Sequence, residues 1–248
     1  MKVKRLLCPS TLPTVAAVLD QVGVKWWLDQ GSLLGLVRDG KFIPWDHDID
    51  IGVWEVSKSD KKRLVEALRE RFDVCYLDEL NNTVKVFFFD AEAAVIWWYD
   101  LSFYLERDGM AVKFWAKPRG AGRGYRVCIG LAAWLRGFST PAAHAPGGRV
   151  GQLFLRFISK TAAFLGVNDV SAKALEKIAK RCFADFVEVR VPASMFHQLR
   201  CVDFGGVFAN VPQDYEDYLR LKYGVSWRIP TRKWDYFVDD GGVVSRLN

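Results

Sequence analysis

The sequence predicts an α+β fold in which a mixed β-sheet is flanked by helices. Three observations indicate it: helical spacing of apolar residues over 11–22, a strand–turn–helix pattern directly after it, and β-rich runs between residues 72 and 116. A basic and mostly helical segment follows, over residues 117–200. We expect one domain spanning residues 1–248, with this segment as an insertion or subdomain, because 248 residues suffice for one large core.

The first elements are a helix and then a strand–turn–helix unit. Residues 11–22 carry valines and leucines at helical spacing, and Gly23 is a stop signal. In residues 25–40 a short apolar run breaks at Gly31 and Ser32 and then resumes with helical spacing. We therefore expect a strand, a tight turn at Gly31-Ser32 and a helix.

The next elements are a strand and a capped helix. Residues 45–54 alternate strictly between polar and apolar side chains, which is typical of a half-buried strand. Ser57 or Ser59 then caps a helix whose apolar stripe runs through residues 60–72.

The remaining elements are strands, then helices. Three β-rich runs precede a hairpin turn at 107–109 and another strand; they cover Phe72–Leu77, Thr83–Phe89, Ala94–Leu105 and, after the turn, Ala111–Ala116. The part from Val127 to Cys182 reads as mostly helical, with a break at 140–148. Near the end, Pro212 opens a helix that stops at Gly224.

The positive charge of the chain is concentrated in one segment. The net charge is +6, yet residues 109–168 hold nine Lys and Arg and no Asp or Glu, so the rest of the chain is slightly acidic. A field of one sign attracts phosphates, nucleic acid or an anionic membrane. Five scattered cysteines without a CxxC pair argue against a disulfide framework and a structural zinc site. We expect a cytoplasmic protein, because neither a secretory signal nor a run long enough to cross a membrane is visible.

The most informative polar residues are two aspartates on the predicted strand at 45–54. Asp48 and Asp50 are two residues apart, so their carboxylates project to the same side, with Asp46 one step earlier on that face. Hard oxygen ligands at this spacing suit Mg²⁺ or Mn²⁺ together with phosphate oxygens of a substrate. The alternative is a solvated acidic edge strand.

Other candidates surround this pair. Gly31 and Ser32 offer backbone N–H groups and a hydroxyl to a phosphate at a helix N-terminus. Asp100 stands inside an apolar strand, which favours a third metal ligand over an outward-facing residue. Arg38 is a candidate diphosphate clamp, although a helix C-terminal cation next to Asp39 explains it nearly as well.

Lys85 is a weaker candidate for the same phosphate-binding role. The three histidines, His47, His144 and His197, lack metal-ligand spacing and are read as non-catalytic.

Residues 26–54, WWLDQGSLLGLVRDGKFIPWDHDIDIGVW, resemble the LicD/fukutin-related family of nucleotidyltransferase-fold proteins. The family pattern is an apolar strand, Gly-Thr or Gly-Ser, Leu-Leu-Gly, an Arg, and Ile-Pro-Trp-Asp-x-Asp-x-Asp. The likeness extends to residues 95–105 and 204–234 and is weak across the basic middle. The chain departs from the pattern in Ser32 for the commoner Thr, and in two residues rather than one between Gly224 and Trp227.

The resemblance implies a nucleotidyltransferase-like sheet and a Mg²⁺-dependent transferase of substituted phosphate groups. Such an enzyme cleaves a CDP-activated donor such as CDP-choline, releases CMP and moves phosphocholine or a polyol phosphate to a glycan hydroxyl, as in lipopolysaccharide biosynthesis. By that resemblance Asp48, Asp50 and Asp100 hold the metal, and Gly31 and Ser32 contact phosphate. Asp46, from its place beside the metal pair, is a hypothetical general base.

Two other functions stay open. One is nucleotidyl transfer from an NTP to a protein, small molecule or nucleic acid, and the other is a binding module without activity. We expect no nucleic-acid partner, because the motif resembles the glycan-modifying branch. Residues 149–164 mix bulky apolar residues with cations, either as an interfacial helix that contacts a lipid-linked acceptor at the inner face of an anionic membrane or as a core-facing helix.

Overall fold

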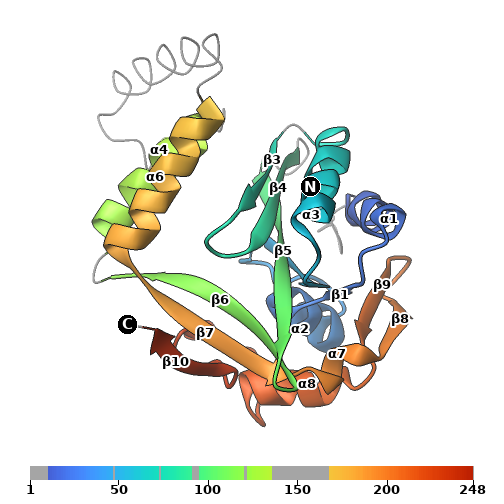
Figure 1. The fold of residues 1–248 in the computed structure, drawn as a ribbon. Helices are drawn as coiled ribbons and strands as arrows, with labels where there is room; N and C mark the ends of the chain where they lie inside the picture. Colours follow the sequence, from blue (N-terminus) through green and yellow to red (C-terminus); the bar gives the residue numbers. More distant parts are fainter. Residues whose placement is uncertain are drawn as a thin grey trace, which may run out of the picture. The chain divides into compact units, whose positions relative to one another are not determined.

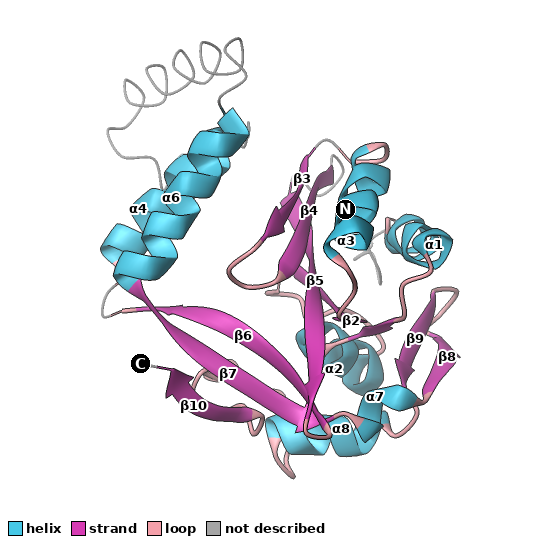
Figure 2. Ribbon diagram, viewed as in Figure 1, coloured by secondary structure: helices cyan, strands magenta, loops and turns pink. Residues whose placement is uncertain are grey.

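The computed structural model describes residues 11–46, 48–72, 74–90, 95–119, 122–135 and 168–247. It confirms the α+β class, with a mixed sheet and flanking helices (Figures 1 and 2). The chain divides into two compact units, one of residues 1–114 and 188–245 and the other of residues 115–187 and 246–248. The candidate site residues named above all lie in the first unit.

The N-terminal elements agree with the sequence, with one shifted boundary. Helix α1 (Leu12–Val22) ends at Gly23, whose φ of 78° is left-handed. Strand β1 (Trp26–Leu28) leads into helix α2 (Gln30–Asp39). Because Asp29 caps this helix by accepting a hydrogen bond from the Gln30 N–H, α2 begins before the predicted turn. Gly31 and Ser32 therefore lie in the first turn of α2.

Five neighbouring strands form the part of the sheet that carries the acidic residues. Strand β2 (Asp48–Trp54) pairs with β1 in antiparallel fashion and with β5 (Val95–Arg107) in parallel fashion. On its other side the first part of β5 pairs with β4 (Thr83–Asp90), which carries β3 (Val74–Asp78) at its outer edge. The strand order over the described residues is β1-β2-β5-β6-β7-β10, with β4 and β3 branching from β5.

The prediction that residues 45–54 form a half-buried strand is wrong in its burial. From Ile49 to Val53 every residue of β2 is buried. The strand lies between β1 and β5, and α2 packs on it so that its first turn covers Asp50. Asp46 precedes the strand and is not part of it.

Helix α3 (Lys58–Arg69) starts at Ser57, one of the two predicted caps, whose Oγ accepts a hydrogen bond from the Asp60 N–H at 3.1 Å. The predicted hairpin joins β5 to β6 (Met110–Pro118). Its turn uses Asp108 and Gly109, both with positive φ.

The later part of the chain adds strands that the sequence patterns did not predict. In the second unit α4 (Arg123–Leu135) packs against α6 (Asn168–Phe183). Strands β7 (Ala184–Pro192) and β10 (Val243–Leu247) extend the sheet order, and β8 (Leu199–Asp203) pairs with β9 (Phe208–Pro212) as a separate hairpin. The predicted helix break at 140–148 lies outside the described residues.

Two helices complete the first unit: α7 (Ser194–His197) and α8 (Tyr215–Tyr223). Helix α8 is the one predicted before Gly224, but Pro212 ends strand β9 rather than opening the helix.

An aromatic cluster around Trp27 fills the core beside the site. The Trp27 ring is fully buried and stacks on Phe196 at 4.4 Å between centroids, with Trp54 and Tyr104 at 5.6 and 5.5 Å. The ring lies directly on Gly52, where an added Cβ would stand 2.3 Å from its atoms. Only glycine lets the β1–β2 pair and this ring coexist.

We expect Gly52→Ala to lower the free energy of unfolding by about 1–3 kcal/mol, because the methyl group would force the Trp27 ring out of its packed position. Urea denaturation followed by tryptophan fluorescence measures the change. Gly130→Ala in α4 is the matched control, since nothing lies within 4 Å of a Cβ there, and should be neutral or slightly stabilising. Equal stability of the Gly52→Ala variant and the unmodified chain would contradict this packing argument.

Candidate functional site

The sheet register brings three of the predicted aspartates to one place. Asp48 and Asp50 are two apart on β2, so they share a face. Asp100 on β5 stands directly opposite Asp50 in the parallel pairing. Both Asp50 and Asp100 are buried, at 9% and 3% exposure, so an acidic edge strand in solvent does not describe them.

Asp46 reaches the same place from the segment before β2. A Cβ added to Gly31 would stand 2.9 Å from Asp46 Oδ2 and 3.7 Å from Asp50 Oδ2. The two carboxylates therefore converge on the first turn of α2, at a position that a larger side chain would fill. The absence of a side chain at Gly31 lets the two carboxylates approach the helix N-terminus this closely.

Burial raises the pKa values of the two central carboxyl groups, Asp50 and Asp100. For Asp50 the causes are burial first and then the nearby charges of Asp48, Asp29 and Asp46, which Lys113 opposes only in part. For Asp100 burial raises the pKa, and Lys85 lowers it by less than burial raises it. Binding a proton or a cation therefore stabilises such a buried carboxyl group.

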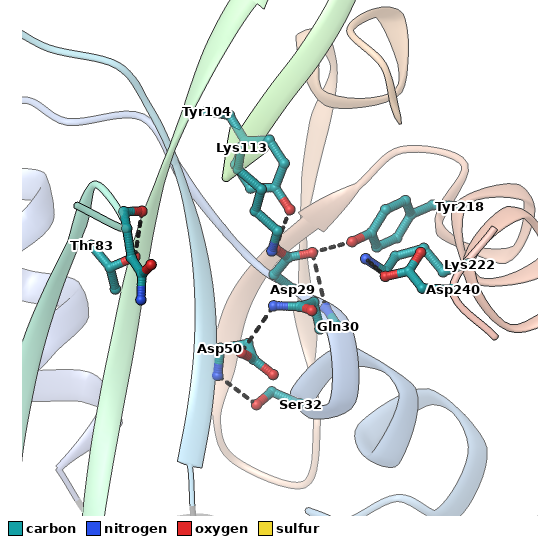
Figure 3. A network of polar contacts seen from close by, with 11 residues as sticks. Asp29, Gln30, Ser32, Asp50, Thr83, Tyr104, Lys113, Tyr218, Lys222 and Asp240 are labelled. Atoms are coloured by element: carbon teal, nitrogen blue, oxygen red, sulfur yellow. Dashed lines mark hydrogen bonds and ion pairs between the residues drawn. The ribbon is translucent and has the colours of Figure 1, made fainter. Parts of the chain in front are cut away.

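The first turn of α2 holds Asp50 at two points (Figure 3). The backbone N–H of Asp50 donates to Ser32 Oγ at 2.8 Å. The side-chain amide of Gln30 donates to Asp50 Oδ1 at 3.0 Å. Ser32 is 2% exposed, so its hydroxyl group is buried in this hydrogen bond to Asp50.

Of the two predicted cations, the structure brings only Lys85 to the acidic residues. Lys85 is opposite Asp100 in the β4–β5 register, and its Nζ lies 2.6 Å from Asp100 Oδ1. Arg38 lies near the C-terminal end of α2, about 10 Å along the helix from Gly31. Its guanidinium makes two hydrogen bonds to Asp39, at 3.0 and 2.7 Å, as in the alternative interpretation of this residue.

A fully buried carboxylate, Asp29, lies behind the acidic residues and was missed by the sequence analysis (Figure 3). It accepts hydrogen bonds from the hydroxyl groups of Tyr104, at 2.6 Å, and Tyr218, and its Oδ2 lies 3.3 Å from Lys113 Nζ. Burial alone would raise its pKa, but Lys113, Lys222 and the two tyrosines lower the pKa below the ordinary value. Its position directly before α2 is a helix-cap signal that could have identified it.

A second buried pair lies next to this network. Lys222 of α8 and Asp240 have side chains with no exposed surface, and the Lys222 Nζ lies 2.7 Å from Asp240 Oδ2. Lys222 also contributes to the lowered pKa of Asp29. The C-terminal part of the first unit thus supplies charge to the region behind the acidic residues.

An exposed aromatic residue lies next to one of the acidic residues in the chain. Trp45, next to Asp46 in the chain, is 46% exposed, and the guanidinium carbon of Arg232 lies 4.8 Å from the centroid of its ring. Tyr223 packs against Trp234 with tilted rings, whose centroids are 4.8 Å apart. Burial, followed by the charges of Asp50, Asp240, Asp29 and Asp46, raises the pKa of Tyr223. No local pattern linked residue 232 to residue 45.

Within the described part of the chain, no group of three or more His, Cys, Asp or Glu side chains is arranged so that it could hold a metal ion by itself. A metal that is shared with a bound substrate needs fewer ligands from the protein. Mg²⁺ usually keeps several waters and takes one or two carboxylates together with substrate phosphates. Asp50, which shares a strand face with Asp48 and stands opposite Asp100, fits such an open site.

No helix among the described residues is long and apolar enough to cross a membrane. Residues 149–164, predicted as either an interfacial or a core-facing helix, lie outside the described residues.

Comparison with known proteins confirms the resemblance seen in the motif. Residues 23–121 match the profile described as "LicD/FKTN/FKRP, nucleotidyltransferase domain". This range contains β1, α2, β2 and the part of β5 that carries Asp100. Every sequence-predicted site residue therefore lies inside the matched range.

Two curated relatives share a shorter segment with the chain. They are the ribitol 5-phosphate transferase FKRP of Mus musculus and that of Homo sapiens, each 46% identical over 55 residues. The aligned segment covers 21% of this chain and 11% of each relative. The likeness therefore concerns a small part of each relative.

We expect Asp50→Asn to stabilise the fold at neutral pH by about 0.5–2 kcal/mol. The pKa of Asp50 is raised in the folded chain, so its ionised form costs stability above the folded pKa, and the cost vanishes below the unfolded value of 3.8. The stability gain should thus shrink as the pH falls toward 4. Urea denaturation at several pH values measures it, with Asp60→Asn on the surface of α3 as control. A variant that is less stable at pH 7.5, or a gain independent of pH, would refute this account.

Proposed function

We propose that the chain transfers a phosphate-linked group, phosphocholine-like or a polyol phosphate, from a CDP-activated donor to a glycan hydroxyl, with release of CMP. The observation that carries the proposal is the convergence of Asp46 and Asp50 above Gly31, with Asp100 opposite Asp50. The match of residues 23–121 and the ribitol 5-phosphate transferase activity for which the two relatives are named support the same class of reaction.

We propose Mg²⁺ or Mn²⁺ as the cofactor, with Asp48, Asp50 and Asp100 as the residues that would hold it. The raised pKa values of Asp50 and Asp100 support this choice, because a bound cation would stabilise the ionised form of such buried carboxyl groups. When bound, the metal would supply positive charge to the donor diphosphate and to the leaving nucleotide.

The protein residues would orient the reactants. The first turn of α2, at Gly31 and Ser32, directs backbone N–H groups and the positive end of the helix dipole toward a phosphate. The acceptor hydroxyl would form the new O–P bond as the bond from that phosphorus to the CMP oxygen breaks. Asp46 would take the hydroxyl proton, since its carboxylate lies beside that of Asp50 and is less deeply buried than Asp50.

Arg232 is a stronger candidate than Arg38 for contact with the donor. Arg38 is held in two hydrogen bonds by Asp39, whereas Arg232 lies over the exposed ring of Trp45, next to Asp46. A guanidinium binds diphosphate oxygens, and an exposed indole ring can stack on a nucleobase. Lys85 would act through Asp100, to which it is paired.

The class of acceptor is proposed from the positive charge of residues 109–168. The basic residues of 109–168 would attract an anionic glycan, a lipid-linked saccharide or the surface of an anionic membrane. Most of this segment lies outside the described residues, so the proposal depends on sequence alone.

The reaction is tested with purified protein, MgCl₂ and a panel of CDP-ribitol, CDP-glycerol, CDP-choline, CDP-ethanolamine and the four NTPs. We expect Mg²⁺-dependent CMP release from one of the CDP donors, lowered about 10²–10³-fold by Asp48→Asn, Asp50→Asn or Asp100→Asn. Pyrophosphate release from an NTP would instead establish nucleotidyl transfer. If calorimetry shows no binding of Mn²⁺ and CDP, the chain is a binding module for something else. Full turnover by Asp46→Asn would remove Asp46 as the base.

The donor contact is tested by Arg232→Gln. We expect the KM for the CDP donor to rise about 10-fold while kcat changes little, because a charge-assisted contact to bound substrate is lost. Arg200→Gln is the matched control, since its guanidinium also lies over a ring, that of Tyr215, at 4.7 Å. A larger KM effect from Arg38→Gln than from Arg232→Gln would restore Arg38 as the clamp.

A further inference from the structure

Gln30 has a backbone conformation that residues with a Cβ atom rarely adopt. Its φ is 44°, in the left-handed region, where glycine and asparagine are the usual residues. Asp108 and Asn82 are the other described non-glycine residues with positive φ. Gln30 is 5% exposed and is the first residue of α2, directly after the Asp29 that links β1 to this helix. Residues held in such conformations cluster at functional sites when the surrounding structure enforces them.

The surrounding structure does enforce it, through Asp29. The backbone N–H of Gln30 donates to Asp29 Oδ1 at 2.9 Å, and the backbone N–H of Asp29 donates to the Asp50 carbonyl at 3.0 Å. The Asp29 carboxylate is itself held by Tyr104, Lys113 and Tyr218 from β5, β6 and α8 (Figure 3). Gln30 therefore has little freedom to rotate.

The side chain of Gln30 points toward the acidic residues. Its Nε2 donates to Asp50 Oδ1 at 3.0 Å, and both residues are buried. The other oxygen, Asp50 Oδ2, is the one that approaches Gly31, near Asp46 Oδ2. An amide bound to one carboxylate oxygen fixes the rotation of the carboxylate and so the direction of the second oxygen.

We propose that Gln30 is a positioning residue: its side-chain amide holds Asp50 Oδ1 so that Asp50 Oδ2 faces the N-terminus of α2 at Gly31, beside Asp46. This inference rests on the proposed function, in which Asp50 is a metal ligand. Residues that orient metal ligands in this way change metal affinity about 10–100-fold when they are removed.

The decisive variant is Gln30→Gly. Glycine is favoured at a φ of 44°, which offsets the loss of the buried amide hydrogen bond, so the variant should unfold at a temperature close to that of the unmodified chain. The positioning role predicts that it nevertheless binds Mn²⁺ about 10-fold more weakly by calorimetry. With the active CDP donor, kcat should fall about 10-fold or more at saturating Mg²⁺, with a smaller change in the KM for the donor.

Two further variants separate reach from backbone effects. Gln30→Asn keeps an amide and tolerates left-handed backbone, but its amide is one methylene shorter and should not reach Asp50, so it should behave like Gln30→Gly. Asp108→Gly is the matched backbone control, because Asp108 has a φ of 50° in the exposed β5–β6 turn. It should leave Mn²⁺ binding and kcat as they are.

The outcomes separate this inference from the proposed function. If the unmodified chain binds Mn²⁺ and releases CMP, and Gln30→Gly does both equally well, Gln30 is not a positioning residue and the proposed function stands. If Gln30→Gly loses Mn²⁺ affinity only together with thermal stability, the role is structural and the inference is overturned. If the unmodified chain neither binds Mn²⁺ nor acts on any CDP donor, both fail.

Discussion

The buried carboxylate of Asp29 is the constraint on which the first unit depends. An unpaired charge in a core is very costly, so the fold must bring donors to it from distant parts of the chain. Tyr104 comes from β5, Lys113 from β6 and Tyr218 from α8, while the N–H of Gln30 comes from the helix that Asp29 caps. These contacts fix where α2 begins, and the start of α2 defines one wall of the acidic site.

The acidic residues, in contrast, lower the stability of the fold, because their buried charges are only partly compensated. Asp50 and Asp100 are buried opposite each other, and Lys85 pairs directly with Asp100. Behind them Asp29 has a lowered pKa, because its neighbours supply positive charge and hydrogen bonds. The unit thus combines a satisfied buried charge with a set of carboxylates that would gain from a cation. Stability is given up at the position where chemistry is proposed.

Local patterns were sufficient for part of this arrangement. The period of two placed Asp48 and Asp50 on one face, and the unusual apolar context of Asp100 indicated a special role. The parallel register that sets Asp100 opposite Asp50 depends on strand pairing between distant segments, which no local pattern encodes. Lys113 is an ordinary cation on an alternating strand until tertiary packing buries it.

The same limit applies to Arg232, which meets Trp45 only through the fold. The burial of β2 was misjudged for a related reason. Strict alternation predicts one exposed face, but the helix that begins at Asp29 covers that face. The sequence was therefore most informative about the residues of the site and least informative about what holds them.

The distance in sequence between Asp29 and Tyr218, 189 residues, has a consequence for biosynthesis. At ordinary translation rates of about 5–20 residues per second, Asp29 leaves the ribosome roughly 10–40 s before Tyr218 does. Through that interval the nascent chain lacks a donor that the buried carboxylate needs, so β1 and α2 cannot reach their final packing. The exposed apolar strands of the growing chain are then natural targets for chaperones, and the acidic site is completed only when α8 has been synthesised.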